Sequence, residues 1–211
     1  MKEIYIFDLD GTLIDSMEPA VKKVLEVLDE YGISYPDDII KILTPLGFRG
    51  ISVYYAEKMG VPLPAEEIYN IFEDRLAAVY EKEVPLKDGV REGLKGLYAR
   101  GARLNVLTAS PHKFTDPCLK ARGIADLFEN VWSAEDFGFL KSDERIYAKV
   151  AERLGADIAE CTMVDDSLRV LKTAKKAGMK TLGVYDEMSA DNEREIRETA
   201  NGYVYKLTEM L

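Results

Sequence analysis

Residues 4–13 read IYIFDLDGTL, a short apolar run that ends on two carboxylates, a glycine and a hydroxyl. The apolar part, residues 4–7, is β-branched or aromatic and indicates a buried parallel strand. Two acids at the end of such a strand repel each other unless a divalent cation lies between them, or unless one attacks a substrate while the other moves a proton. The alternative is an ordinary Asp-rich turn. The intact string D-x-D-G-T-L after an apolar strand favours catalysis over a turn.

The composition limits the classes of protein and partner that fit this chain. Its 211 residues, 47% hydrophobic and 31% charged, suit one α/β domain with an insertion or two modest domains. A formal net charge of -10 argues against nucleic acid or an anionic membrane surface as partner, so we expect neither. We recognise no signal peptide and no membrane-spanning apolar run, and we expect the two cysteines to be reduced. We therefore expect a cytoplasmic protein, either a monomer or a homodimer.

Six apolar segments at regular spacing predict the strands of one sheet. Helical patterns separate the later segments, which indicates an α/β fold with a Rossmann-like, doubly wound parallel sheet. Ser110 is the predicted N-cap of a helix with Pro111 at its first position, and Gly178 is the predicted stop of a helix at 167–177. The strand segments are residues 3–8, 103–108, 129–133, 161–165, 180–184 and 203–205.

The first two strands are separated by far more chain than a βαβ crossover needs. Apolar residues at helical spacing in this interval predict helices over residues 17–31 and 68–80. The simplest interpretation is a helical cap domain of residues 16–85, inserted into a Rossmann-like catalytic core of residues 1–15 and 86–211. Such a cap would close over the carboxylates and exclude water during the reaction.

Two of the predicted strands end in paired acids, Asp8 with Asp10 and Asp165 with Asp166. A shared metal site accounts for both pairs, and oxygen ligands from few residues suit Mg²⁺ that keeps some of its waters. The alternative for Asp166 is a cap on the helix that follows it.

The string at residues 8–13 resembles the first motif of the haloacid dehalogenase superfamily of aspartate-nucleophile phosphohydrolases. Three later segments resemble the other motifs of that family in order: the strand that ends at Thr108, GFLK at 138–141 and CTMVDDS at 161–167. Without the resemblance, Thr108 would be read as a cap and Lys141 as a surface group. The predicted insertion is similar to the helical cap of phosphoglycolate-phosphatase-like and β-phosphoglucomutase-like members.

The resemblance implies a role for each residue of the first two motifs. Asp8 would be the nucleophile that forms an aspartyl phosphate with the substrate. Asp10 would protonate the leaving group and later take a proton from the attacking water. Thr108 and the backbone amides of Leu9 and Ala109 would bind the phosphoryl oxygens.

The third and fourth motifs imply the charges that balance the phosphate. Lys141 would neutralise the nucleophile and the incoming phosphoryl group. The implied Mg²⁺ site consists of Asp8, the carbonyl of Asp10 and the carboxylate of Asp166, while Asp165 assists or orients a metal-bound water.

These features predict a Mg²⁺-dependent phosphatase for a small phosphorylated metabolite, similar to phosphoglycolate phosphatase. Arg49, in the segment LGFRG at 46–50, is a candidate contact for the leaving group, with a surface arginine as the alternative. Other functions stay open. They are a β-phosphoglucomutase-type phosphomutase, although residues 16–19 lack the histidine usual there; a pyrophosphatase; a haloacid dehalogenase, which needs neither Asp10 nor a metal; and a non-catalytic phospho-ligand sensor.

Overall fold

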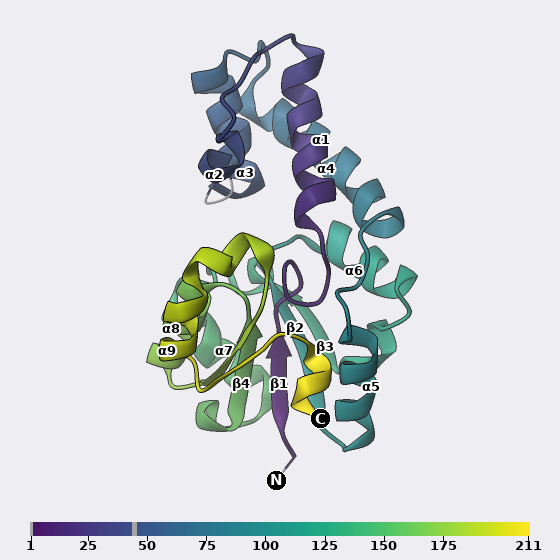
Figure 1. Ribbon diagram of the computed structural model, residues 1–211, viewed down its shortest axis with the longest axis vertical. Helices are drawn as coiled ribbons and strands as arrows, with labels where there is room; N and C mark the ends of the chain where they lie inside the picture. Colours follow the sequence, from purple (N-terminus) through teal and green to yellow (C-terminus); the bar gives the residue numbers. More distant parts are fainter. Residues whose placement is uncertain (1, 44–45) are drawn as a thin grey trace. The chain divides into compact units, whose positions relative to one another are not determined.

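The chain folds into two compact units. The computed structural model describes residues 2–43 and 46–211; Met1, Thr44 and Pro45, which fall inside the predicted domain ranges, lie outside the described residues. The first unit, called the core unit here, comprises Met1–Ser16 and Val84–Leu211, and the second, called the helical unit, comprises Met17–Glu83 (Figure 1). That these units act as a catalytic core and a cap stays a prediction.

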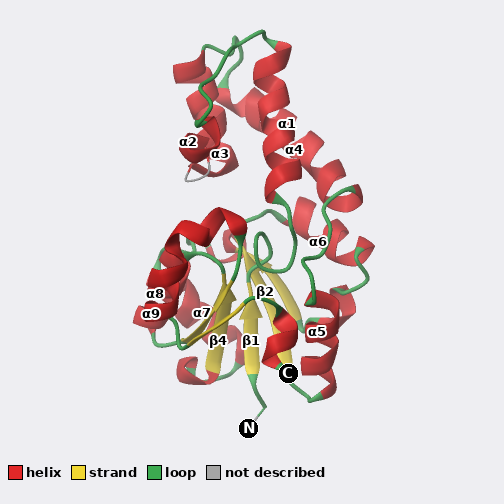
Figure 2. Ribbon diagram, viewed as in Figure 1, coloured by secondary structure: helices red, strands yellow, loops and turns green. Residues whose placement is uncertain are grey.

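The core unit contains a six-stranded parallel sheet with the strand order β3-β2-β1-β4-β5-β6 (Figure 2). This order and the parallel pairing confirm the predicted doubly wound α/β fold. All six predicted strands are present, each within about a residue of its predicted bounds. They are β1 (Ile4–Phe7), β2 (Arg103–Thr108), β3 (Asn130–Ser133), β4 (Cys161–Asp165), β5 (Lys180–Val184) and β6 (Gly202–Val204).

Helices cover both faces of the sheet. On one face lie α5 (Val90–Ala99) and α6 (His112–Ala121), and on the other lie α7 (Glu144–Leu154), α8 (Leu168–Ala177) and α9 (Glu193–Thr199) (Figure 1). Gly178 ends α8 in the left-handed conformation, as predicted. The alternating side chains Ile4 and Ile6 of β1 pack with Met163 of β4 into a core cluster that includes residues of α7 and α8. Among the described helices, none is long and apolar enough to cross a membrane.

Strand β1 lies at the centre of the sheet, so the residues that follow it are flanked on both sides. Phe7 is paired with Val106 of β2 and with Val164 of β4, which brings the carboxyl ends of the three strands level. Asp8 comes immediately after β1, while Thr108 and Asp165 are the last residues of their strands. The register therefore places three of the predicted site residues at one edge of the sheet.

The helical unit contains the two helices that the apolar spacing predicts, α1 (Met17–Glu30) and α4 (Ala65–Lys82). Between them lie α2 (Ile39–Leu43), α3 (Gly47–Tyr54) and a π-helical turn (Tyr55–Met59). The buried side chain of Tyr55 holds the unit together: its hydroxyl donates to the carbonyl of Val24 at 3.2 Å, and its ring meets Phe72 edge to face at 5.6 Å between centroids.

The substitution Gly93→Ala tests how tightly α5 packs against the C-terminal turn, Leu207–Met210. A Cβ on Gly93 would lie 2.7–2.8 Å from Leu207, including its backbone, so neither side can easily yield. We expect a loss of about 1–3 kcal/mol in the free energy of unfolding, measured by urea denaturation.

Gly96→Ala is the matched control on the same helix. The three atoms nearest to its new Cβ all belong to the Leu211 side chain, which can move. Alanine has the better helix propensity by up to about 1 kcal/mol, so this variant should be near neutral or slightly stabilised. Equal stability of the two variants would contradict the packing argument.

Candidate active site

Lys141 brings together the acids at the carboxyl edge of the sheet. Its Nζ lies 2.6 Å from Oδ1 of Asp8 and 2.7 Å from Oδ2 of Asp165. The three residues are almost inaccessible to water, with exposed fractions of 7% for Lys141, 8% for Asp8 and 0% for Asp165. The Tyr147 hydroxyl donates to the carbonyl of Lys141 at 2.5 Å and fixes the backbone there. Lys141 therefore lies inside the site and is not a surface lysine.

The electrostatics of this cluster leave it with excess negative charge. Burial alone would lower the pKa of Lys141, but the charges of Asp165 and Asp8 outweigh burial and raise that pKa above its usual value. Burial raises the pKa of Asp8 to about 7, although Lys141 opposes the shift and Asp165 adds to it. Burial, followed by repulsion from Asp165 and Asp8, also raises the pKa of Asp166. One ammonium group does not balance these carboxylates.

The donor set fits a divalent cation. Asp8, Asp165 and Asp166 each offer a carboxylate oxygen, and these three oxygens lie within 4.8 Å of one another. Oxygen donors in a negatively charged, water-poor site are those that a hard cation prefers. The predicted contribution of Asp10 is its carbonyl oxygen, and that contribution stays a prediction.

Gly11 and Thr12 position the carboxylate of Asp166. Gly11 has φ of +78°, a conformation that favours glycine, and a Cβ at this position would lie 2.9 Å from an Asp166 oxygen. The Thr12 hydroxyl donates to Oδ1 of Asp166 at 3.2 Å. The amide of Ser167, the residue that precedes α8, donates to Oδ1 of Asp165 at 2.8 Å and not to Asp166. The alternative that Asp166 merely caps α8 is therefore wrong.

Two serine hydroxyls hold the Asp10 carboxylate. Ser16 donates to Oδ1 at 2.6 Å, and Ser110 donates to Oδ2 at 2.7 Å. The prediction that Ser110 caps the next helix is wrong, because Pro111 is the residue that precedes α6 and no side chain caps it. The Ser110 amide instead donates to the buried hydroxyl of Thr108 at 3.0 Å. As an acceptor in this bond, Thr108 can still donate its own proton to another group.

The remaining predicted residues belong to both units. Leu9 is buried directly between Asp8 and Asp10, and Ala109 is exposed next to Thr108. Arg49 belongs to the helical unit, where its guanidinium lies 4.1 Å from the centre of the Tyr69 ring and 3.8 Å from Glu66. Its predicted contact with a leaving group stays a prediction.

Lys87 and Asp186, which sequence reasoning missed, form an ion pair beside the site. Lys87 Nζ lies 2.6 Å from Oδ2 of Asp186 and also donates to the carbonyl of Gly11 at 2.5 Å. Neither residue belongs to a recognisable motif. Only the fold brings the segment before α5 against the loops that follow β1 and β5.

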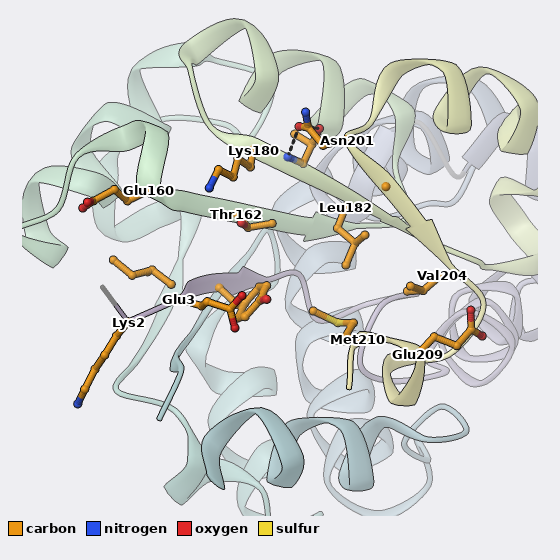
Figure 3. A pocket seen from close by; sticks show the side chains of 14 residues that line it. Lys2, Glu3, Glu160, Thr162, Lys180, Leu182, Asn201, Val204, Glu209 and Met210 are labelled. Carbon is orange, nitrogen blue, oxygen red and sulfur yellow. Dashed lines mark hydrogen bonds between the residues drawn. The ribbon is translucent and has the colours of Figure 1, made fainter. Parts of the chain in front are cut away.

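A cavity of about 480 Å³ lies away from the acid cluster (Figure 3). It is lined by residues near the starts of β1, β4 and β5, at the opposite, amino edge of the sheet, and by residues of β6 and the C-terminal turn. Its labelled side chains include Lys2, Thr162 and Asn201. None of the acids described above contributes to it. Its size does not make it the candidate active site, since ligands of open parallel sheets bind at the carboxyl edge.

Comparison with known proteins shows which family this chain resembles. The family of haloacid dehalogenase-like hydrolases matches residues 5–184. The chain is 31% identical to pyrophosphatase PpaX of Bacillus velezensis, over 85% of this chain and 81% of the relative. It is 28% identical to a phosphoglycolate phosphatase of Psychrobacter arcticus, over 87% and 83%. The structure of CbbY from Rhodobacter sphaeroides in complex with phosphate has the same fold, with a TM-score of 0.84, 21% identity and coverage of 100% and 96%.

Lys141→Met should destabilise the metal-free protein by about 3 kcal/mol or more, because it leaves buried carboxylates without their cation. The loss in the free energy of unfolding should be larger at pH 8 than at pH 5.5. Loss of the lysine raises the folded-state pKa of Asp8 further, and an acid with a raised folded pKa loses stability as the pH climbs above its unfolded pKa near 4. Urea denaturation in EDTA at both pH values measures the difference.

Lys176→Met is the control, because Lys176 is an exposed lysine paired with Glu144 on the surface. It should cost less than about 1 kcal/mol at either pH. A similar loss in the free energy of unfolding of the two variants would show that the buried ion pairs of Lys141 stabilise the protein no more than a surface pair does.

Proposed function

Since this chain belongs to the haloacid dehalogenase-like hydrolases and is a phosphatase of that family, we propose that it hydrolyses a small phosphomonoester through an aspartyl phosphate on Asp8, with Mg²⁺ bound. The observation that carries this proposal is the buried contact of Lys141 with Asp8 at 2.6 Å, beside the carboxylates of Asp165 and Asp166. Because Asp8 is buried, little water competes with the substrate for its carboxylate, and the Lys141 ammonium group attracts an incoming phosphoryl group.

In the first half of the reaction, an oxygen of Asp8 bonds to phosphorus while the ester P–O bond breaks. Asp10 gives its proton to the departing alcohol oxygen. The two serine bonds, at 2.6 and 2.7 Å, keep the Asp10 carboxyl group in one orientation next to the nucleophile. Lys141 compensates the negative charge that would otherwise repel the phosphate.

In the second half, water attacks the phosphorus of the aspartyl phosphate, and Asp10 takes the proton of that water. The bond between phosphorus and Asp8 breaks, which releases inorganic phosphate and restores the free carboxylate. The hydroxyl of Thr108 and the amides of Leu9 and Ala109 would bind the phosphoryl oxygens in both halves.

Mg²⁺ would be held by Asp8, Asp166 and the carbonyl of Asp10, and Asp165 would support it. When bound, it supplies positive charge to the phosphoryl oxygens. The raised pKa of Asp8 explains why a cation is needed: burial favours the protonated form, which is a poor nucleophile, whereas a neighbouring cation favours the ionised form.

The names of the relatives indicate a broad class of substrate for this chain. The relatives named above act on phosphoglycolate and on pyrophosphate, as their names state. We propose a small phosphorylated metabolite of this kind, and the helical unit with Arg49 as the part that would select it. Arg49→Ala should then raise KM for the best substrate and leave Mg²⁺ binding unchanged.

Asp8→Asn should lower phosphate release by at least about a thousandfold, because the amide oxygen is a poor nucleophile. The assay measures phosphate released from 2-phosphoglycolate, sugar phosphates and pyrophosphate, with Mg²⁺ and with EDTA. The control is Asp126→Asn, at an exposed aspartate outside the site, which should leave turnover unchanged. Residual turnover in Asp8→Asn close to that of the wild type would rule out the aspartyl-phosphate route.

Mg²⁺ affinity should rise by at least about tenfold between pH 5.5 and pH 8. The pKa of Asp8 is raised to about 7 and that of Asp166 is also raised, so protons occupy the ligands at the lower pH and the metal must displace them. Calorimetric titration of the metal-free protein in two buffers of different ionisation enthalpy measures both the affinity and the protons released. An affinity independent of pH, with no proton release, would contradict the proposed ligand set.

A further inference from the structure

The ammonium group of Lys87 joins three segments of the core unit. It donates to the carbonyls of Gly11 at 2.5 Å and Tyr185 at 2.7 Å, and to Oδ2 of Asp186 at 2.6 Å. These bonds use all three N–H groups of the lysine. The side chains of Lys87 and Asp186 are only 17% and 9% exposed, so solvent screens the pair weakly.

Backbone hydrogen bonds hold the Lys87 segment against the loop that follows β1. The Lys87 amide donates to the carbonyl of Leu13 at 3.0 Å, and Ile14 forms a bridge with Leu86. Lys87 is therefore anchored at its own backbone before its side chain reaches the Gly11 carbonyl. Its side chain can therefore hold this loop at a fixed distance from the end of β5.

The Gly11 carbonyl is the point at which Lys87 reaches the acid cluster. Gly11 lies directly against the Asp166 carboxylate, and Thr12 donates to that carboxylate. The peptide on the other side of Gly11 carries the carbonyl of Asp10. A bond that fixes the Gly11 carbonyl therefore fixes the backbone on which both groups depend.

We propose that Lys87 is a positioning residue of the metal site, which holds the turn at Gly11 so that the Asp10 carbonyl and the Asp166 carboxylate face one cation. This inference rests on the proposed function, because it assumes that those two groups bind the metal. Lys87 belongs to the segment that leads the chain back from the helical unit into the core unit, and it touches no predicted ligand side chain.

A positioning role and a purely electrostatic role predict opposite signs for the variant Lys87→Met. Removing a positive charge near a cation site removes a Coulomb repulsion, so on electrostatic grounds alone the variant should bind the cation more tightly. Releasing the Gly11 turn should weaken binding, since loss of a partner that orients metal ligands typically costs 10- to 100-fold in affinity. The direction of the change therefore separates the two explanations.

The experiment is a calorimetric titration of Mg²⁺ into the metal-free 211-residue chain, for the wild type, Lys87→Met and Lys87→Arg, well below their melting temperatures. We expect Lys87→Met to weaken Mg²⁺ binding by about 10- to 100-fold. Lys87→Arg keeps the charge, but its planar guanidinium cannot direct donors at three converging acceptors as an ammonium does. It should therefore recover only part of the affinity.

Two further variants complete the design. Lys95→Met removes the same charge from an exposed position of α5 and should leave the affinity unchanged. Lys87→Met combined with Asp186→Asn removes the buried unpaired carboxylate, which keeps the test valid if Lys87→Met alone does not fold, and it should also bind weakly.

Mg²⁺ binding by Lys87→Met as tight as that of the wild type, or tighter, would overturn the inference while leaving the phosphatase proposal intact. Full recovery of affinity in Lys87→Arg would support the inference, because an electrostatic role alone predicts that a positive charge at this position weakens Mg²⁺ binding. A failure of the proposed function is distinguishable: the wild type itself would bind no Mg²⁺ and release no phosphate.

Discussion

The candidate active site at the carboxyl edge of the sheet depends on one buried interaction. This is the contact of the Lys141 ammonium group with the carboxylates of Asp8 and Asp165. Burying carboxylates without a partner is costly, because water no longer solvates them. One lysine offsets part of that cost and leaves a net negative site. Burial, with repulsion from Asp165, raises the pKa of Asp8, and the excess negative charge beside Lys141 attracts a divalent cation. Stability and the proposed chemistry therefore share one cause.

The parallel sheet makes that interaction possible. Because β1 lies between β2 and β4 in matched register, residues far apart in the chain end at the same edge. Short loops then complete the site: Gly11 admits the Asp166 carboxylate, and serines from two loops orient Asp10. Lys87 ties the loops after β1 and β5 together from outside. Rigid strands set the coarse positions, and the loop contacts set the orientation of each group.

The errors and omissions of the sequence-based interpretation have a common origin. The prediction of Ser110 as a helix cap relies on serine before proline, which is a good local signal, yet its hydroxyl donates to Asp10 in the loop that follows β1. Lys87 and Asp186 carried no signal, because their partners lie in other segments, and Ser16 carried none, because its bond to Asp10 depends on the conformation of the loop after β1. Such long-range polar bonds follow no local periodicity, whereas strands and helices do.

The sequence by itself determined the elements and the chemistry of their ends. The strands follow from apolar runs, the helices from apolar spacing, and the acidic residues from the D-x-D-G-T-L string and the pair at Asp165 and Asp166, because these signals are local. Only the tertiary structure decided that Lys141 is buried between two of these acids, that Asp166 faces Gly11, and that Lys87 holds that turn. These facts depend on strand order and register, which bring distant residues within hydrogen-bond reach and which no short stretch of sequence encodes.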